Sequence, residues 1–271
     1  HKSQDTYYIN NQDYVTELRD NLNKYSSKYF KLQENLSNIN DIEGKIFIYN
    51  EFIAAKNGGA IFTAFILETL GFQRKIKKNR ENKFMISPLF PEIKTEPNNK
   101  YYIQLDGSIE SKQRDVYISE FNNPNNDYGD NIKIIIGSMT LSEGVSLKNI
   151  REIHILDTWY NYSRIEQIQG RGVRHCSHAN MPFEKRNVTI YNYIVTLQNT
   201  ITNIDADKKC FLEYNTYKGD QGTNDLRKLY LSSTKLDKII KIQNILISNS
   251  IDFLLNKNNN NFSAKIYLQS D

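Results

Sequence analysis

The sequence has few cysteines and no long apolar run, and these absences exclude several classes of protein. Among its 271 residues are two cysteines, Cys176 and Cys210, which lie far apart and fit no zinc-ligand spacing. We therefore expect reduced thiols in a reducing compartment and no bound metal. No run of about 18 apolar residues is present to cross a membrane, and the N-terminus lacks the apolar stretch of a secretory signal. The chain is thus expected to be soluble and cytoplasmic.

Loops that hold nucleotide phosphates are also missing from the sequence. There is no G-x-x-x-x-G-K-[ST] loop, and no Asp-Glu pair ends a strand as a magnesium ligand. There is also no G-x-G-x-x-G after a strand, which disfavours a dinucleotide-binding enzyme. Any nucleotide phosphates must therefore be cradled by a different domain.

What is present is enough for one full domain with appendages. Hydrophobic residues make up 39% of the chain and charged residues 24%, so a real core is available. The net charge of +4 at pH 7 is compatible with a phosphate backbone as partner but does not require one. Because His1 has no preceding methionine, we expect a piece of a longer protein.

The order of apolar runs predicts an α/β fold. Short apolar runs alternate with helical patterns, and this alternation predicts a parallel sheet with helices on both faces. The predicted strands are residues 45–49, 101–105, 132–136, 152–156 and 188–195. The predicted helices are two segments within 13–39, a helix from Ala60 that Gly71 closes, and residues 110–121, 163–174 and 223–255.

These elements predict three parts of the chain. We expect a helical lead-in over residues 1–40, the sheet domain over 41–200 and a helical tail over 201–271. Residues 73–100 are basic and then contain Pro and Asn, so they are predicted to be an insertion or long loop. Only residues 83–87 of that stretch could form a brief strand.

The sharpest motif is the sequence QIQGRGVR. At helical offsets of four and three, its Gln167, Arg171 and Arg174 should lie on one face, so two guanidinium groups converge. Arginine suits the spread negative charge of a transferring phosphoryl group. Gly170 and Gly172 each cost a helix about 1 kcal/mol relative to Ala, which favours close approach of another surface.

An ordinary solvent-facing helix is the alternative for an isolated R-x-x-R, and the preceding loop weighs against it. The sequence SMTLSEGVSL, rich in Ser, Thr and Gly, follows the predicted strand 132–136. Loops at the carboxyl ends of parallel strands are where such sheets bind ligands.

Together these residues resemble motifs V and VI of superfamily 2 helicases and translocases, whose second RecA-like domain ends in Q-x-x-G-R-x-x-R. GKIFIYNEF resembles motif IV, and LDGSIESKQRDVYISEFN resembles a segment of the Swi2/Snf2-like branch. The strings SEGVSLKNI, LDTWYNYSRIEQIQGRGVRHCSH and PFEKRNVTIY are similar to helicases of large cytoplasmic DNA viruses, the group that includes the poxvirus early transcription factor small subunit and nucleoside triphosphatase I. The resemblance covers about residues 24–195. It departs from the usual wording at SEG (142–144) and at Asn50, where Ser is frequent.

The resemblance implies the RecA-like C-terminal motor domain of a DNA-dependent ATPase. Arg171 and Arg174 would be fingers that reach ATP across a cleft, and Gln167 would support them. ATP and Mg would be held mainly by an N-terminal RecA-like domain outside this sequence. The other ATP-lining residues would be Glu143, Gly144 and Gly170.

The resemblance also implies a nucleic-acid partner, which would be DNA, with RNA as the alternative. Ser138, Met139 and Thr140 would lie near its backbone. Gly58 and Gly59 would expose amides at a helix start, where phosphate is favoured, although a simple N-terminal cap explains them equally well.

Further partners would be a viral RNA polymerase or transcription factor, in a viral factory or virion, and no membrane. The alternative function is a non-hydrolysing module that docks transcription machinery. Two features stay open. Trp159 could stack on a base, although core packing is the commoner role of such a residue. The group His175, Cys176 and His178 fits local packing better than a metal site.

Overall fold

The computed structural model describes residues 2–3, 6–7, 12–38, 43–54, 58–77, 84–93, 95–107, 109–138, 145–196 and 223–251. The chain divides into two compact units. The first is formed by His1–Thr158 and Glu166–Ile194, and the second by Trp159–Ile165 and Val195–Asp271.

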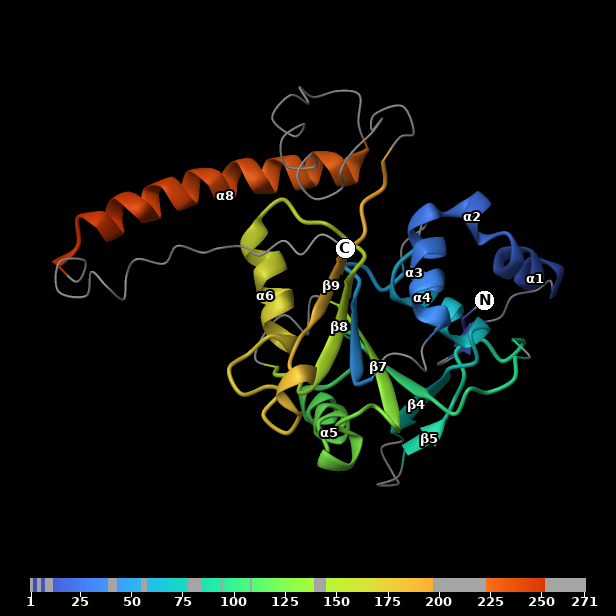
Figure 1. Ribbon diagram of the computed structural model, residues 1–271. Helices are drawn as coiled ribbons and strands as arrows, with labels where there is room; N and C mark the ends of the chain where they lie inside the picture. The colour runs from blue at the N-terminus through green and yellow to red at the C-terminus, as the bar shows by residue number, and fades with distance from the viewer. Residues whose placement is uncertain are drawn as a thin grey trace. The chain divides into compact units, whose positions relative to one another are not determined.

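The first unit is built on a seven-stranded sheet with the order β5-β4-β6-β7-β3-β8-β9 (Figure 1). Neighbouring strands are parallel throughout, except that β5 runs antiparallel to β4. The strands are β3 (Lys45–Tyr49), β4 (Gln73–Lys77), β5 (Phe84–Ile86), β6 (Tyr101–Leu105), β7 (Ile132–Gly137), β8 (Ile150–Ile155) and β9 (Thr189–Asn192). The predicted RecA-like parallel sheet is confirmed.

Helices cover both faces of this sheet, as predicted. In Figure 1, α3 and α4 lie on one side of the strands and α5 and α6 on the other. The helices of the chain are α1 (Gln12–Asp20), α2 (Leu22–Tyr25), α3 (Ser27–Ser37), α4 (Ala60–Thr69), α5 (Ser111–Phe121), α6 (Tyr162–Gly172) and α8 (Asn224–Ser248), with short 3-10 turns η2 (Pro124–Asn126) and η4 (Phe183–Lys185). A two-stranded antiparallel pair, β1 (Lys2–Ser3) and β2 (Thr6–Tyr7), precedes α1.

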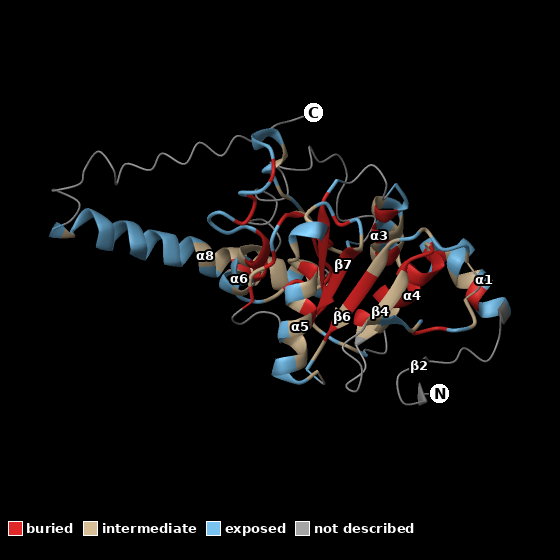
Figure 2. Ribbon diagram, turned by 90° about the horizontal axis from the view of Figure 1, so that it is seen from below, coloured by how far each residue is buried: buried red, intermediate tan, exposed pale blue. Residues whose placement is uncertain are grey.

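The central strands are apolar along their whole length because both of their faces are covered. All five residues of β3 and all six of β7 are buried. Figure 2 shows β7 and the neighbouring part of α4 as buried. Side chains that alternate along β3 and β7, such as Ile46, Ile48 and Ile134, pack against α4 in one core cluster.

The lead-in forms three helices where two were predicted, because the chain breaks again at Asn21 and at Ser26. Ser26 caps α3, its side chain accepting a hydrogen bond from the Tyr29 amide at 3.4 Å. Leu22, Tyr29 and Leu32 are buried in the same core cluster as β3 and α4. These helices therefore pack on the sheet domain itself.

The prediction of an insertion over residues 73–100 was wrong at its start. Residues Gln73–Lys77 form β4, a strand of the main sheet that pairs in parallel with β6. The strand was missed because its sequence, QRKIK, lacks an apolar run. Beyond β4 lies only the three-residue β5, so residues 73–76 are half-buried and basic side chains can reach solvent.

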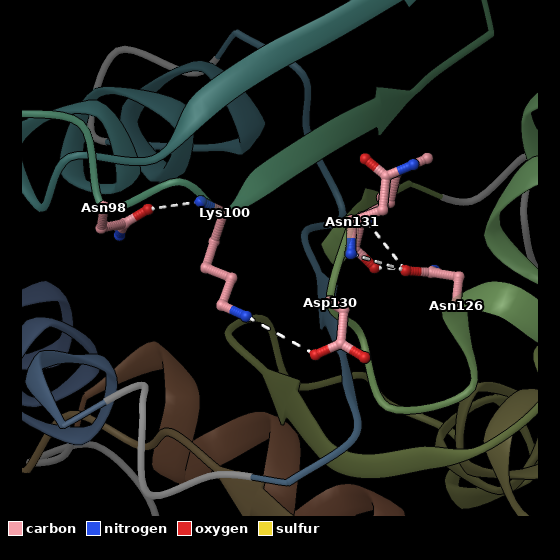
Figure 3. Close-up of polar contacts among 6 residues, drawn as sticks. Asn98, Lys100, Asn126, Asp130 and Asn131 are labelled. Atoms are coloured by element: carbon pink, nitrogen blue, oxygen red, sulfur yellow. Dashed lines mark hydrogen bonds and ion pairs between the residues drawn. The ribbon is translucent and has the colours of Figure 1, made fainter.

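Asn126 organises the amino-terminal edge of the sheet. Its Nδ2 donates to the backbone oxygens of Phe121 and Ile132, both at 3.0 Å, and its Oδ1 accepts from the amides of Asn131 and Ile132. Figure 3 shows this contact beside Lys100, whose ammonium lies 3.8 Å from the Asp130 carboxylate. Lys100 precedes β6, so this ion pair marks the edge where the parallel strands begin.

The second unit contains α8, a helix of 25 residues. Thr223 caps it, accepting from the Leu226 amide at 3.3 Å. The helix was predicted to run to residue 255, whereas it ends at Ser248, and residues 252–255 lie outside the described part. Within the described residues, no helix is long and apolar enough to span a membrane.

Candidate functional site

Arg171 lies near the end of α6 and is buried, with 9% of its surface exposed. Its Nη1 donates to the backbone oxygen of Val145 at 3.2 Å. Its own backbone oxygen accepts from the Leu147 amide at 2.9 Å. Arg171 therefore fastens the end of α6 to the segment that leads into β8.

Arg174 lies beyond the helix, which corrects the prediction that α6 extends to it. The helix ends at Gly172, where an added Cβ would lie 3.0 Å from the Ile150 side chain of β8. The backbone passes so close to the strand there that a larger residue would have to displace the Ile150 side chain by a few tenths of an ångström. Arg174 is exposed, and its Nη1 donates to the Ser146 hydroxyl.

The two guanidinium groups nevertheless converge, although Arg174 lies beyond the helix on which the spacing placed it. Arg171 contacts Val145 and Arg174 contacts Ser146, so the two contacts fall on consecutive residues of one segment. One arginine is a buried tether and the other is exposed to solvent. The exposed guanidinium of Arg174 can therefore contact a ligand outside the chain, whereas the buried guanidinium of Arg171 stabilises the fold.

The face of α6 around these arginines is open. Gln167 is exposed, and among the described residues no atom outside the neighbouring turns of α6 lies within 4 Å of a Cβ built on Gly170. The predicted close approach of another surface is therefore realised at Gly172, by Ile150, whereas the described residues leave room beside Gly170.

The carboxyl ends of the central strands carry a second group of polar residues. Asn50 follows β3 and Ser138 follows β7, and both are buried. The Glu51 amide after β3 donates to the Asp157 carboxylate after β8 at 2.8 Å. Lys28 of α3 reaches the same edge, where its Nζ donates to the Leu156 backbone oxygen at 2.8 Å.

Asn50 is used inside the fold, since its Oδ1 accepts a hydrogen bond from the Thr63 hydroxyl at 3.0 Å. The predicted residues Met139, Thr140, Glu143 and Gly144 lie outside the described part of the chain.

At the start of α4 the Gly59 amide is used inside the protein, so the hypothesis of an exposed amide is wrong for Gly59, whereas the nucleic-acid role of Gly58 stays a prediction. The Gly59 amide donates to the Tyr29 hydroxyl at 2.7 Å. The next two amides, of Ala60 and Ile61, donate to backbone oxygens of residues 52 and 53. An added Cβ on Gly58 would lie 2.4 Å from the Tyr29 hydroxyl oxygen, so both glycines make room for this internal cap.

With this geometry established, comparison with known proteins decides the family. Residues 68–176 match the family model of the helicase conserved C-terminal domain. This part of the chain is a helicase C-terminal domain. The match includes Ser138 and the whole QIQGRGVR motif, and it begins after Gly58 and Gly59.

Viral proteins share the sequence of this helicase C-terminal domain. A protein of Acanthamoeba polyphaga mimivirus, named as an ATP-dependent RNA helicase, is 28% identical over 185 residues, which are 68% of this chain. Nucleoside triphosphatase I of Heliothis armigera entomopoxvirus is 42% identical over 96 residues, which are 35% of this chain. The chain spans only 28% and 15% of the lengths of these two relatives.

Among solved structures, the C-terminal part of the Fun30 ATPase domain aligns with a TM-score of 0.46 at 17% identity. The alignment covers 86% of this chain and 57% of that one.

The sequence left open the roles of Trp159 and of the group His175, Cys176 and His178, and the structure shows local contacts for Trp159 and His178. His178 is buried, with its ring nitrogens 2.8 Å from Ser177 Oγ and 2.6 Å from the Ile150 backbone oxygen, as local packing requires. Trp159 is half-buried, and the Arg164 guanidinium lies 4.0 Å from its ring centroid.

No sequence pattern pointed to three residues that shape these sites. Tyr29 and Lys28 lie in the lead-in, and their contacts span 30 and 128 residues of chain. Asn122 ends α5 and contacts residues 24 and 26 positions later. Contacts at such separations depend on how the elements pack, which no local pattern encodes.

Proposed function

We propose that this domain is the C-terminal motor half of a DNA-dependent ATPase and supplies Arg174 as a finger to ATP bound by a separate RecA-like domain. The observation that carries the proposal is the pairing of the two arginines on Val145 and Ser146. Arg171 holds the segment in place, and Arg174 presents its guanidinium to solvent beside it. Gln167 and the open backbone at Gly170 leave space for the second domain.

The chemistry follows from the nature of the arginine side chain. Phosphoryl transfer spreads negative charge over the γ-phosphate oxygens, and a planar guanidinium fork can bind two of them at once. The contribution is largest in the transition state, so Arg174 would raise turnover more than ATP affinity. ATP and Mg would be held mainly by the other domain, because this sequence has no phosphate-binding loop. Glu143 and Gly144 would line the nucleotide.

The nucleic-acid backbone is proposed to bind at the carboxyl ends of the central strands. Lys28 brings a positive charge to this edge, where an ammonium can attract a phosphate group of the backbone. Ser138 follows β7 at this edge, and Met139 and Thr140 are proposed as further contacts on the strength of the family resemblance. We propose DNA as the partner. Competition between DNA and RNA for binding to the chain would distinguish the two.

The ATPase would act in viral transcription or DNA processing in the cytoplasm, since its relatives include a poxviral nucleoside triphosphatase. The second candidate is a non-hydrolysing module that docks transcription machinery. The exposed isoleucines of α8, such as Ile242 and Ile245, favour some docking role for the second unit.

Turnover measurements distinguish the two functions. The chain alone should hydrolyse no ATP above background, and a polypeptide that joins it to its phosphate-binding domain should show DNA-stimulated turnover. Absence of turnover in the joined polypeptide, with DNA present, would favour the docking module. Robust DNA-stimulated turnover by the chain alone would refute the proposal that a separate domain binds the ATP.

A further inference from the structure

Asn122, the residue that ends α5, holds both sides of the segment on which the two arginines converge. Its Nδ2 donates to the Ser146 backbone oxygen at 2.8 Å, and its Oδ1 accepts from the Lys148 amide at 2.9 Å. One side-chain amide thus spans residues 146–148 in the manner of a neighbouring strand. The side chain uses a donor and an acceptor at once, which only Asn or Gln can do in this form.

The arginines hold two of these three residues, Arg171 from the end of α6 and Arg174 from the residues that follow it. Arg174 donates to the Ser146 hydroxyl, and the Leu147 amide donates to the Arg171 backbone oxygen. Ser146 is therefore fixed through its backbone by Asn122 and touches Arg174 through its side chain. A shift of Ser146 would move the position at which Arg174 is held.

We propose that Asn122 is a positioning residue for the arginine finger, acting through Ser146 on Arg174. This proposal rests on the proposed function. Asn122 touches neither nucleotide nor nucleic acid in this scheme. It couples the end of α5 to the geometry of Arg174, so its loss misplaces the guanidinium without removing it.

The test is a double-mutant cycle in the joined, DNA-stimulated ATPase. Asn122→Ala removes both hydrogen bonds and should lower kcat by about 10-fold to 100-fold, the range that a misplacement of about 1 Å produces, with KM for ATP within twofold. Arg174→Ala should lower kcat further. In the Arg174→Ala background, adding Asn122→Ala should change kcat by less than about twofold, because the residue it positions is already gone.

Two further variants separate positioning from general stability. Asn122→Asp keeps the acceptor for the Lys148 amide but puts a carboxylate oxygen against the Ser146 carbonyl, so it should lose kcat like Asn122→Ala. Asn123→Ala is the matched control, because Asn123 caps η2 through the Asn125 amide and makes no contact with residues 146–148 in the described structure. It should leave kcat unchanged. In the chain alone, hydrogen exchange at the Lys148 amide should quicken in Asn122→Ala and stay unchanged in Asn123→Ala.

The outcomes distinguish this proposal from the proposed function. Turnover within twofold of wild type in Arg174→Ala would overturn the finger assignment and this proposal with it. A large Arg174→Ala effect with an additive Asn122→Ala effect, or with none, would overturn only the positioning role. A wild-type kcat in Asn122→Asp would also overturn the positioning role. That variant keeps the hydrogen bond from the Lys148 amide and loses the hydrogen bond to the Ser146 backbone oxygen.

Discussion

The hydroxyl of Ser146 accepts a hydrogen bond from the guanidinium of Arg174, an exposed residue two positions beyond the end of α6. Three residues earlier, Arg171 makes its contact to the chain from a buried position. The motif therefore combines an arginine that holds the fold together with one that remains accessible. A substitution at each position should have a different physical effect.

Tyr29→Phe should destabilise the domain by about 1–3 kcal/mol, because it leaves the buried Gly59 amide without its acceptor. Burial raises the pKa of the Tyr29 phenol to about 12, so the hydroxyl is neutral and available for this bond at neutral pH. The measurement is urea unfolding monitored by circular dichroism. Tyr14→Phe is the control, since Tyr14 is 62% exposed, and it should change stability by less than about 0.5 kcal/mol. Equal effects of the two substitutions would contradict the internal cap.

Stability should rise between pH 8 and pH 10, because Lys45 is buried in the folded state. Burial lowers the pKa of Lys45 from 10.5 to about 8, while its Nζ donates to the Phe121 backbone oxygen. In this window the unfolded chain binds more protons than the folded one, so the free energy of unfolding increases with pH. The full effect of one lysine is on the order of 3 kcal/mol.

Lys45→Met should flatten this pH dependence, because the variant no longer buries a titrating amine. Lys133 shares the behaviour, since burial also lowers its pKa to about 8, so the slope should shrink rather than vanish. The comparison is urea unfolding of wild type and variant at pH 7 and pH 9.5. A wild-type stability that falls over this interval would show that Lys45 is solvated.

The sheet could be predicted from the sequence because its central strands are buried on both faces and therefore appear as unbroken apolar runs, as in KIFIY and IKIII. Strand β4 could not be predicted, because it pairs near the margin of the sheet and keeps the basic side chains of Arg74 and Lys75 half-exposed. The arginine motif was recognisable from its spacing, but the end of α6 was not. The close approach of Gly172 to Ile150 depends on how α6 packs against β8, which no local pattern encodes. The helix ends there, so Arg174 lies beyond it. For the same reason, no local pattern predicted that the Tyr29 hydroxyl accepts from the Gly59 amide.

DNA binding by the chain should be weak, independent of sequence and sensitive to salt, because the proposed contacts reach the backbone. Lys28→Ala should lower the affinity and reduce the slope of log K against log salt by about one, the contribution of one phosphate contact. Fluorescence anisotropy with a labelled duplex at several salt concentrations measures both quantities. Lys100→Ala is the matched control, because Lys100 lies at the opposite edge of the sheet beside Asp130 (Figure 3). Identical losses in the two variants would place the DNA elsewhere.

The central claim is that Arg174 acts on ATP and Arg171 holds the fold. It is tested most directly by DNA-stimulated turnover and melting temperature of Arg174→Ala and Arg171→Ala in the joined ATPase. Arg174→Ala should lower kcat by about three orders of magnitude with little change in melting temperature or ATP affinity, and Arg174→Lys should rescue poorly because an ammonium lacks the planar fork. Arg171→Ala should lower the melting temperature, since it removes a buried hydrogen bond to Val145. Turnover of Arg174→Ala within about twofold of wild type, with the fold intact, would contradict the account.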